Sequence, residues 1–282
     1  MATLQEKAMI VRLKISLWTA MAVDSSATQE AHKAMNAAAD AGKYKKYLVK
    51  CDELKKLRRS AYHVRRMVKE LTLPWYDDGA RLLTAAAHMD FVKKVRKAVG
   101  DFTACRTNFV GRYSEIKAES KKRLGKMFDE TEFPTKEELE KAFNVTYKIE
   151  NVPSADDFRV AVSAKDAEEI RAQIEEDVQK QVTVGMKDLW VRLKDALSHV
   201  TEKLSDKESV FRDSLIGNVK SLCETLPKLN LTNDKEFDAI VKEVQKTVAT
   251  LEPEKLRKDP KVRKDAAGAA NAIINKMKGY GI

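Results

Sequence analysis

Glycine and proline are scarce in this 282-residue chain, which has 10 glycines and 6 prolines. Both residue types build tight turns or interrupt helices, so their scarcity predicts long uninterrupted helices. The three cysteines, Cys51, Cys105 and Cys223, are odd in number and far apart in sequence. This excludes an even disulfide framework, and no cysteine–histidine spacing suggests zinc. We therefore expect reduced thiols.

Long apolar runs are also absent. No charge-free stretch reaches the about 18 residues that a membrane-spanning helix requires. Residues Met1–Trp18 alternate charged with apolar side chains and lack the apolar segment of a signal peptide. Hydrophobic residues make up 43% of the chain and charged residues 34%. We therefore expect a folded cytoplasmic protein with a highly charged surface and no contact with a membrane.

Positive charge is concentrated in one segment. The net charge of the chain is +10, and residues Lys43–Lys69 alone account for +9, with Asp52 and Glu53 as their only acids. The remaining 255 residues are therefore almost neutral. The eleven bases of the segment are Lys43, Lys45, Lys46, Lys50, Lys55, Lys56, Arg58, Arg59, Arg65, Arg66 and Lys69.

Three short stretches alternate apolar with polar residues, which is the period of a half-buried β-strand. They are Val11–Leu17, Val145–Glu150 and Phe158–Ser163, and a connection containing Pro153 joins the last two. None of these strands is stable alone. We predict that they form one small antiparallel sheet, in which Val11–Leu17 pairs with one of the two later strands.

Helical spacing of apolar residues fills most of the remaining chain. Leu54–Leu71 forms a heptad seam that the bases avoid, and its helix should stop near Leu73-Pro74. The other predicted helices are Ala80–Phe128, a short one from the Thr135/Glu138 capping box to Phe143, Ala164–Leu204, Ser209–Leu226, Asp234–Leu251 and Pro253–Met277. Unbroken, Ala164–Leu204 would be about 60 Å long.

These elements predict a mainly α fold with one small antiparallel β-sheet, that is, the α+β class. We divide the chain into an N-terminal α+β unit, residues 1–163, and a C-terminal helical region, residues 164–282, which together can form one cooperative unit. Two such long helices cannot both be covered by their own neighbours over their whole length. A protruding helical hairpin or burial in a homo-oligomer is therefore expected, with a compact elongated bundle as the alternative.

Motifs for catalysis are missing from the sequence. No phosphate-binding GxxxxGK[ST] occurs, and no GxGxxG follows a strand. The four histidines form neither HxxxH nor HExxH. Asp77 and Asp78, followed by Gly79, could hold a divalent ion or act as acid and base, but N-capping of the next helix is the favoured interpretation. We expect a non-enzymatic protein without metal or cofactor.

The basic segment Lys43–Lys69 is the candidate functional surface. Cations neutralise phosphates and release counterions, and aromatic rings stack on unpaired bases. Tyr44, Tyr47 and Tyr62 lie among the lysines and arginines. The predicted nucleic-acid contacts are these three tyrosines and the eleven bases given above. The alternative is a solvated helix face, paired with acidic helices such as Glu168–Asp177.

Several short motifs resemble a family of phage and prophage proteins without an assigned function. In order they are Tyr44–Leu48, Leu73–Gly79, Asp157–Val160, Asp188–Trp190, Phe211–Leu215 and Leu226–Asn230. Their order and spacing extend over most of the chain. Tyr76 departs from the family pattern, because glycine is expected at that position. The resemblance implies a viral origin, a non-enzymatic accessory role in the cytoplasm of an infected bacterium, and a gene often near a MoxR-type AAA+ ATPase. It transfers no catalytic residue.

We predict a phage nucleic-acid-binding protein that acts as a homo-oligomer, with single-stranded DNA as its ligand. The alternative is a structural or adaptor protein whose basic face docks an acidic partner such as an AAA+ ATPase ring.

Overall fold

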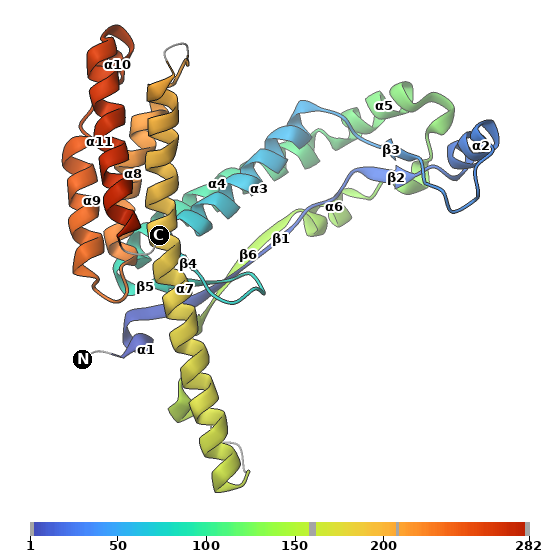
Figure 1. The fold of residues 1–282 in the computed structure, drawn as a ribbon. Helices are drawn as coiled ribbons and strands as arrows, with labels where there is room; N and C mark the ends of the chain where they lie inside the picture. The colour runs from blue at the N-terminus through green and yellow to red at the C-terminus, as the bar shows by residue number, and fades with distance from the viewer. Residues whose placement is uncertain (1–2, 158–161, 207–208, 280–282) are drawn as a thin grey trace. The chain divides into compact units, whose positions relative to one another are not determined.

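The computed structural model describes residues 3–157, 162–206 and 209–279 (Figure 1). The predicted α+β fold class is confirmed: long helices accompany one four-stranded antiparallel sheet, and a second sheet has two strands. The chain divides into two compact units. Unit 1 comprises Met1–Arg12, Val68–Val92 and Lys148–Ile282, and unit 2 comprises Leu13–Met67 and Lys93–Tyr147. Both units thus draw on residues before 163, the position at which the sequence analysis divides the chain.

The four-stranded sheet has the order β4-β5-β1-β6. Its strands are β1 (Ala8–Ser16), β4 (Leu73–Pro74), β5 (Ala80–Thr84) and β6 (Asn144–Asn151). The predicted strands at Val11–Leu17 and Val145–Glu150 are β1 and β6, and the predicted pairing of the first with a later strand is confirmed. The third predicted strand, Phe158–Ser163, falls largely on residues 158–161, which lie outside the described residues.

Strand β5 replaces the start of the helix predicted at Ala80. It pairs antiparallel with β1, so that Ile10 lies opposite Leu82, and its residues Leu82 and Leu83 are fully buried. A short apolar run fits a strand or a helix equally well, and here pairing on both sides decides for the strand. A 3₁₀ turn, η1 (Ala85–Ala87), follows before helix α4 begins.

Asp77 and Asp78 consequently lie in the turn between β4 and β5 and do not cap a helix, so the N-cap interpretation is wrong. Asp78 accepts a hydrogen bond from the Ala80 amide at 3.0 Å, as turn aspartates commonly do. Gly79 has a φ of 83° and Tyr76 a φ of 52°, both in the left-handed region that favours glycine.

Helix α7 (Ala164–Ser205) confirms the long predicted helix, and α8 (Ser214–Leu229) and α11 (Pro260–Lys278) pack against it. The other helices of unit 1 are α1 (Leu4–Lys7), α9 (Lys235–Thr247) and α10 (Pro253–Lys258), and a 3₁₀ turn, η4 (Ala155–Asp157), precedes α7. Figure 1 shows α8 and α11 beside α7. The helix predicted over Pro253–Met277 is interrupted, because Asp259 caps α11 and Pro260 occupies its first turn.

Helix α7 is buried along only part of its length. Its first buried residue is Val178, and residues 164–177 include none. Further along, Gly185 lets the helix approach β4: a Cβ built there would lie 3.3 Å from Leu73 Cδ1. The C-terminal part of α7 therefore belongs to the core of unit 1, and its first 14 residues do not.

Two arginines of unit 1 satisfy carbonyl groups that follow the last turn of α3 (Asp52–Glu70). The Arg81 and Arg192 guanidinium groups both donate to the Thr72 carbonyl, at 2.9 and 2.7 Å. Burial and the neighbouring Arg192 lower the pKa of Arg81 to about 10, so it stays charged at neutral pH. These contacts close the exit of α3 without a glycine cap.

Unit 2 is built around α3, α4 (His88–Gly111) and α5 (Tyr113–Leu124). The helix predicted over Ala80–Phe128 is thus divided at Arg112, directly after Gly111. The remaining elements are β2 (Met21–Val23), α2 (Ser25–Met35), β3 (Lys45–Tyr47), two 3₁₀ turns, η2 (Gly125–Met127) and η3 (Glu130–Glu132), and α6 (Lys136–Ala142). The predicted capping box of Thr135 and Glu138 is confirmed at the start of α6.

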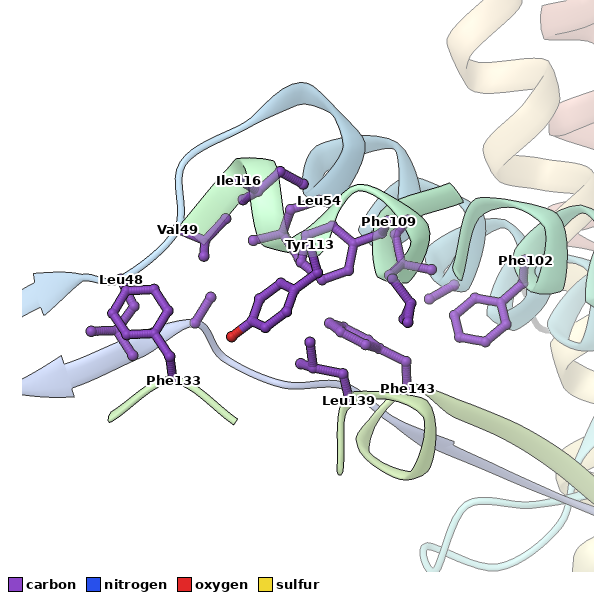
Figure 2. Packing of buried hydrophobic residues seen from close by; sticks show 14 of the residues in the cluster. Leu48, Val49, Leu54, Phe102, Phe109, Tyr113, Ile116, Phe133, Leu139 and Phe143 are labelled. Atoms are coloured by element: carbon purple, nitrogen blue, oxygen red, sulfur yellow. The ribbon is translucent and has the colours of Figure 1, made fainter. Parts of the chain in front are cut away.

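The core of unit 2 joins the seam of α3 to an aromatic cluster (Figure 2). Phe109 packs edge-on against Phe143 with ring centroids 5.5 Å apart, and both are fully buried. Tyr113 and Ile116 extend the same cluster, together with Leu54 of α3. Most of the apolar seam of α4 and α5 is therefore covered within the chain and is not left for an oligomer.

Candidate nucleic-acid interface

The basic residues of α3 lie opposite its buried seam. Leu57, Ala61 and Val64 are fully buried, whereas the bases between them are exposed. At about 100° per residue, Lys55, Arg59, Tyr62 and Arg66 fall within one narrow arc of the helix. We call these four residues the α3 stripe. Tyr62 lies between Arg59 and Arg66 along the helix and is 65% exposed.

Three further bases, Lys56, Arg58 and Arg65, are exposed on either side of the stripe. Some of the predicted contacts already have partners. Lys55 forms an exposed ion pair with Asp52 at 2.9 Å, and Arg58 donates to the Thr19 carbonyl at 2.5 Å. Exposed ion pairs such as that of Lys55 with Asp52 contribute little to stability, so an incoming phosphate can replace Asp52 there. Lys69 is exposed on the last turn of α3, in the part of the helix that belongs to unit 1.

Lys46 is the exception among the predicted contacts. Its side chain is 7% exposed, and its ammonium group lies 2.9 Å from Glu132, 3.3 Å from Asp24 and 2.7 Å from the Met127 carbonyl. Burial disfavours its charged form, but the hydrogen bonds to Glu132 and Asp24 outweigh this and raise the pKa of Lys46. Lys46 holds β3 in place and is not available to a phosphate.

A second exposed group surrounds β3. Tyr44 is 48% exposed and Tyr47 is 58% exposed, beside the exposed bases Lys43, Lys45 and Lys50. Arg123, at the end of α5, donates to the carbonyls of Tyr47 and Leu48. This contact brings the basic end of α5 to β3.

Sequence reasoning missed that end of α5. Lys121, Lys122, Arg123 and Lys126 form a second basic run, in which Arg123 is about 75 residues away in sequence from Tyr47 and Leu48, which it contacts. A further run, Lys93–Lys97, is exposed at four of its five positions on α4. Both runs were visible as local clusters of lysine and arginine. Their place in the same compact unit as α3 was not.

The net positive charge of the chain comes entirely from unit 2. This unit has 25 lysines and arginines against 14 aspartates and glutamates, a net charge of +11. Unit 1 has 28 against 29, a net charge of −1. A field of this strength attracts polyanions and speeds their association.

The other candidate groups have structural partners. Asp78 pairs with Arg12 at 2.5 Å, and this hydrogen bond is the main reason why the pKa of Asp78 is lowered. Burial raises the pKa of Cys51 and brings that of Cys223 to about 11, which keeps both as thiols at neutral pH.

The described residues contain neither a group of metal-ligating side chains nor a membrane-spanning helix. Within residues 3–157, 162–206 and 209–279, no three histidine, cysteine or acidic side chains are grouped to hold a metal ion. Over the same ranges, no helix is both long and apolar enough to span a bilayer.

No protein-family model, curated protein or solved structure matches this chain.

Proposed function

We propose that this protein binds nucleic acid through unit 2, with single-stranded DNA as the preferred ligand and without catalysis. The observation that carries the proposal is the α3 stripe, an exposed aromatic ring flanked by exposed cations on one face of a helix. Cations along this face can neutralise successive phosphates, and the net charge of +11 on unit 2 supports long-range attraction.

The exposed tyrosines support a single-stranded ligand. Tyr44, Tyr47 and Tyr62 are each about half exposed or more, which is unusual for side chains that gain from burial. Bases in a duplex are already stacked on one another, whereas unpaired bases offer free faces to a ring. Tyr44 and Tyr47 lie beside Lys43 and Lys45, so ring and cation can contact the same nucleotide.

The test replaces the cations of the stripe, Lys55→Gln, Arg59→Gln and Arg66→Gln, in one variant. Its control is Lys220→Gln, Lys242→Gln and Lys246→Gln, three exposed lysines of unit 1, which change the net charge equally. Fluorescence anisotropy with labelled single- and double-stranded DNA and RNA gives the affinity at several salt concentrations. Surface changes of this type alter stability by about 0.5 kcal/mol or less, so both variants should fold.

We expect the stripe variant to bind every sequence more weakly, with a salt slope shallower by about 0.7 unit per lost phosphate contact. The control should bind like the wild type. If the wild-type protein binds no nucleic acid at low salt, or the stripe variant binds as tightly as the control, the proposal is wrong. The adaptor function, in which the same face docks an acidic partner such as an AAA+ ATPase, then becomes the better explanation.

We also propose that two copies associate through residues 164–177 of α7. Ile170 and Ile174 continue the apolar seam of this helix but are only partly buried, whereas the buried residues of α7 begin at Val178. A second copy of the same segment would cover them. The resemblance to phage and prophage proteins supports a viral setting, in the cytoplasm of an infected bacterium, for both proposals.

A further inference from the structure

A cavity of about 790 Å³ opens in unit 1, far in sequence from the basic segment. It lies between the C-terminal end of α7, helix α10 and the first turns of α11, which Figure 1 shows beside one another. Cavities of about 300–1,000 Å³ are typical of sites for small ligands. Four of its nine lining residues are cations, and none is an acid. This is unexpected in a unit whose net charge is −1.

Two of the cations are fixed in place by the protein. Arg263 donates to the carbonyls of Leu204 at 3.1 Å and Lys203 at 2.8 Å, which close the end of α7. Arg257 forms an ion pair with Asp213. Both guanidinium groups also lie over the Phe211 ring, 5.3 and 5.5 Å from its centroid. The wall of the cavity is therefore held rigid before any ligand arrives.

The other two cations, Lys261 and Lys264, are exposed at the rim on successive turns of α11. Among the residues that the structure describes, no carboxylate pairs with either of them. Two lysines three residues apart on a helix lie on the same face. Their ammonium groups repel each other unless an anion lies between them.

The floor of the cavity is apolar. Leu204, Leu256 and Ala267 form it but are only 2%, 1% and 7% exposed, so the apolar side chain that a ligand can reach is that of Pro260. No aromatic side chain lines the cavity, so it offers no stacking platform for the bases of a nucleic acid. The combination of an aliphatic floor and a cationic rim matches a molecule with one apolar and one anionic end.

We propose that this cavity binds a small amphipathic anion, whose charged head contacts Lys261 and Lys264 and whose apolar body contacts Pro260. The site is separate from the proposed nucleic-acid interface and does not depend on it.

The test is calorimetric titration of the full-length protein with octyl phosphate below its micellar concentration. Inorganic phosphate and octanol, each carrying one half of the probe, are titrated in parallel. We expect one saturable site per chain for octyl phosphate, and binding at least about tenfold weaker for either half. The variant Lys261→Gln/Lys264→Gln should also bind octyl phosphate about tenfold more weakly or worse, because it loses both charged contacts.

The matched control is Lys242→Gln/Lys246→Gln on α9, which removes the same charge from the same unit and should leave the affinity unchanged. Thermal unfolding followed by circular dichroism establishes that both variants are folded. The proposal is overturned if octyl phosphate does not bind, if it binds with several equivalents per chain, or if both variants bind it alike. Equal binding of inorganic phosphate would also overturn it.

Discussion

The two units of this chain differ most in their charge. Unit 2 has a net charge of +11 and exposes Tyr44, Tyr47 and Tyr62, whereas unit 1 has a net charge of −1. Among the described residues of unit 1, Tyr76 is the one aromatic side chain that is exposed by more than a third. The isoelectric point of 9.3 is therefore an average over two units of opposite sign. Affinity for a polyanion should follow from unit 2 alone.

The largest effect, on the free energy of unfolding, is expected at Lys46. This residue was predicted to contact nucleic acid but is buried in unit 2. Lys46→Met leaves the carboxylates of Asp24 and Glu132 without their shared cation, and it should lower the free energy of unfolding by about 3 kcal/mol. Lys45→Met, one residue earlier and exposed, should change it by about 0.5 kcal/mol or less. Denaturant unfolding measures both. Equal losses would mean that the buried cation has no structural role.

Replacing an exposed tyrosine should weaken binding of single-stranded DNA when the residue lies in unit 2, but not when it lies in unit 1. Tyr62→Ala should cost about 1–3 kcal/mol in the free energy of binding single-stranded DNA, with an unchanged salt slope because no charge is lost. Tyr76→Ala in unit 1 should have no effect on binding. If Tyr62→Ala makes the salt slope shallower, the ring supports its charged neighbours and does not stack on bases.

Self-association should depend on unit 1. Ile170→Glu/Ile174→Glu places charge on the uncovered seam of α7 and should weaken association by about 2 kcal/mol or more, from lost apolar burial alone. Ala172→Glu/Gln173→Glu, at two exposed positions of the same segment, is the control. Sedimentation equilibrium at micromolar concentration measures both. A wild-type protein that sediments only as a 31.9 kDa species contradicts the dimer.

The smallest effect concerns the backbone at Tyr76. Its φ of 52° lies where only glycine is unstrained, so Tyr76→Gly should be more stable than Tyr76→Ala by about 1 kcal/mol. Both variants lose the contact of the ring with Trp75, so that loss cancels in the comparison. Thermal unfolding measures the difference. An alanine variant of equal stability would show that the turn relaxes out of the left-handed region.

Patterns that repeat over many residues can be predicted from the sequence. The seam of α3 and the long helix α7 were predicted because each repeats its apolar spacing over several turns, and β1 and β6 were predicted from their strict alternation. Strand β5 has five residues and β3 has three, which is too short for a period to distinguish strand from helix. Their pairing with distant strands decides their conformation.

The candidate site also has a part that local periodicity predicts and a part that depends on contacts between distant residues. The exposed face of α3 follows from its own periodicity, and the structure places those side chains as expected. The burial of Lys46 could not be predicted, because it depends on Glu132, 86 residues further along the chain. The basic end of α5 joins the surface only because Arg123 contacts Tyr47 and Leu48.

The discontinuity of the two units has a consequence for synthesis on the ribosome. All residues of unit 2 have been translated once Tyr147 is added, but unit 1 still lacks its last 135 residues, including the whole of α7. At about 5–20 residues per second, these take roughly 7–27 s to appear. During that interval Ile10 and Leu82 can pair but have no helical layer to cover them. The nascent chain thus carries a complete cationic unit and an incomplete second unit whose apolar strands are uncovered. A chaperone that protects it should act on the first 12 residues and on residues 68–92.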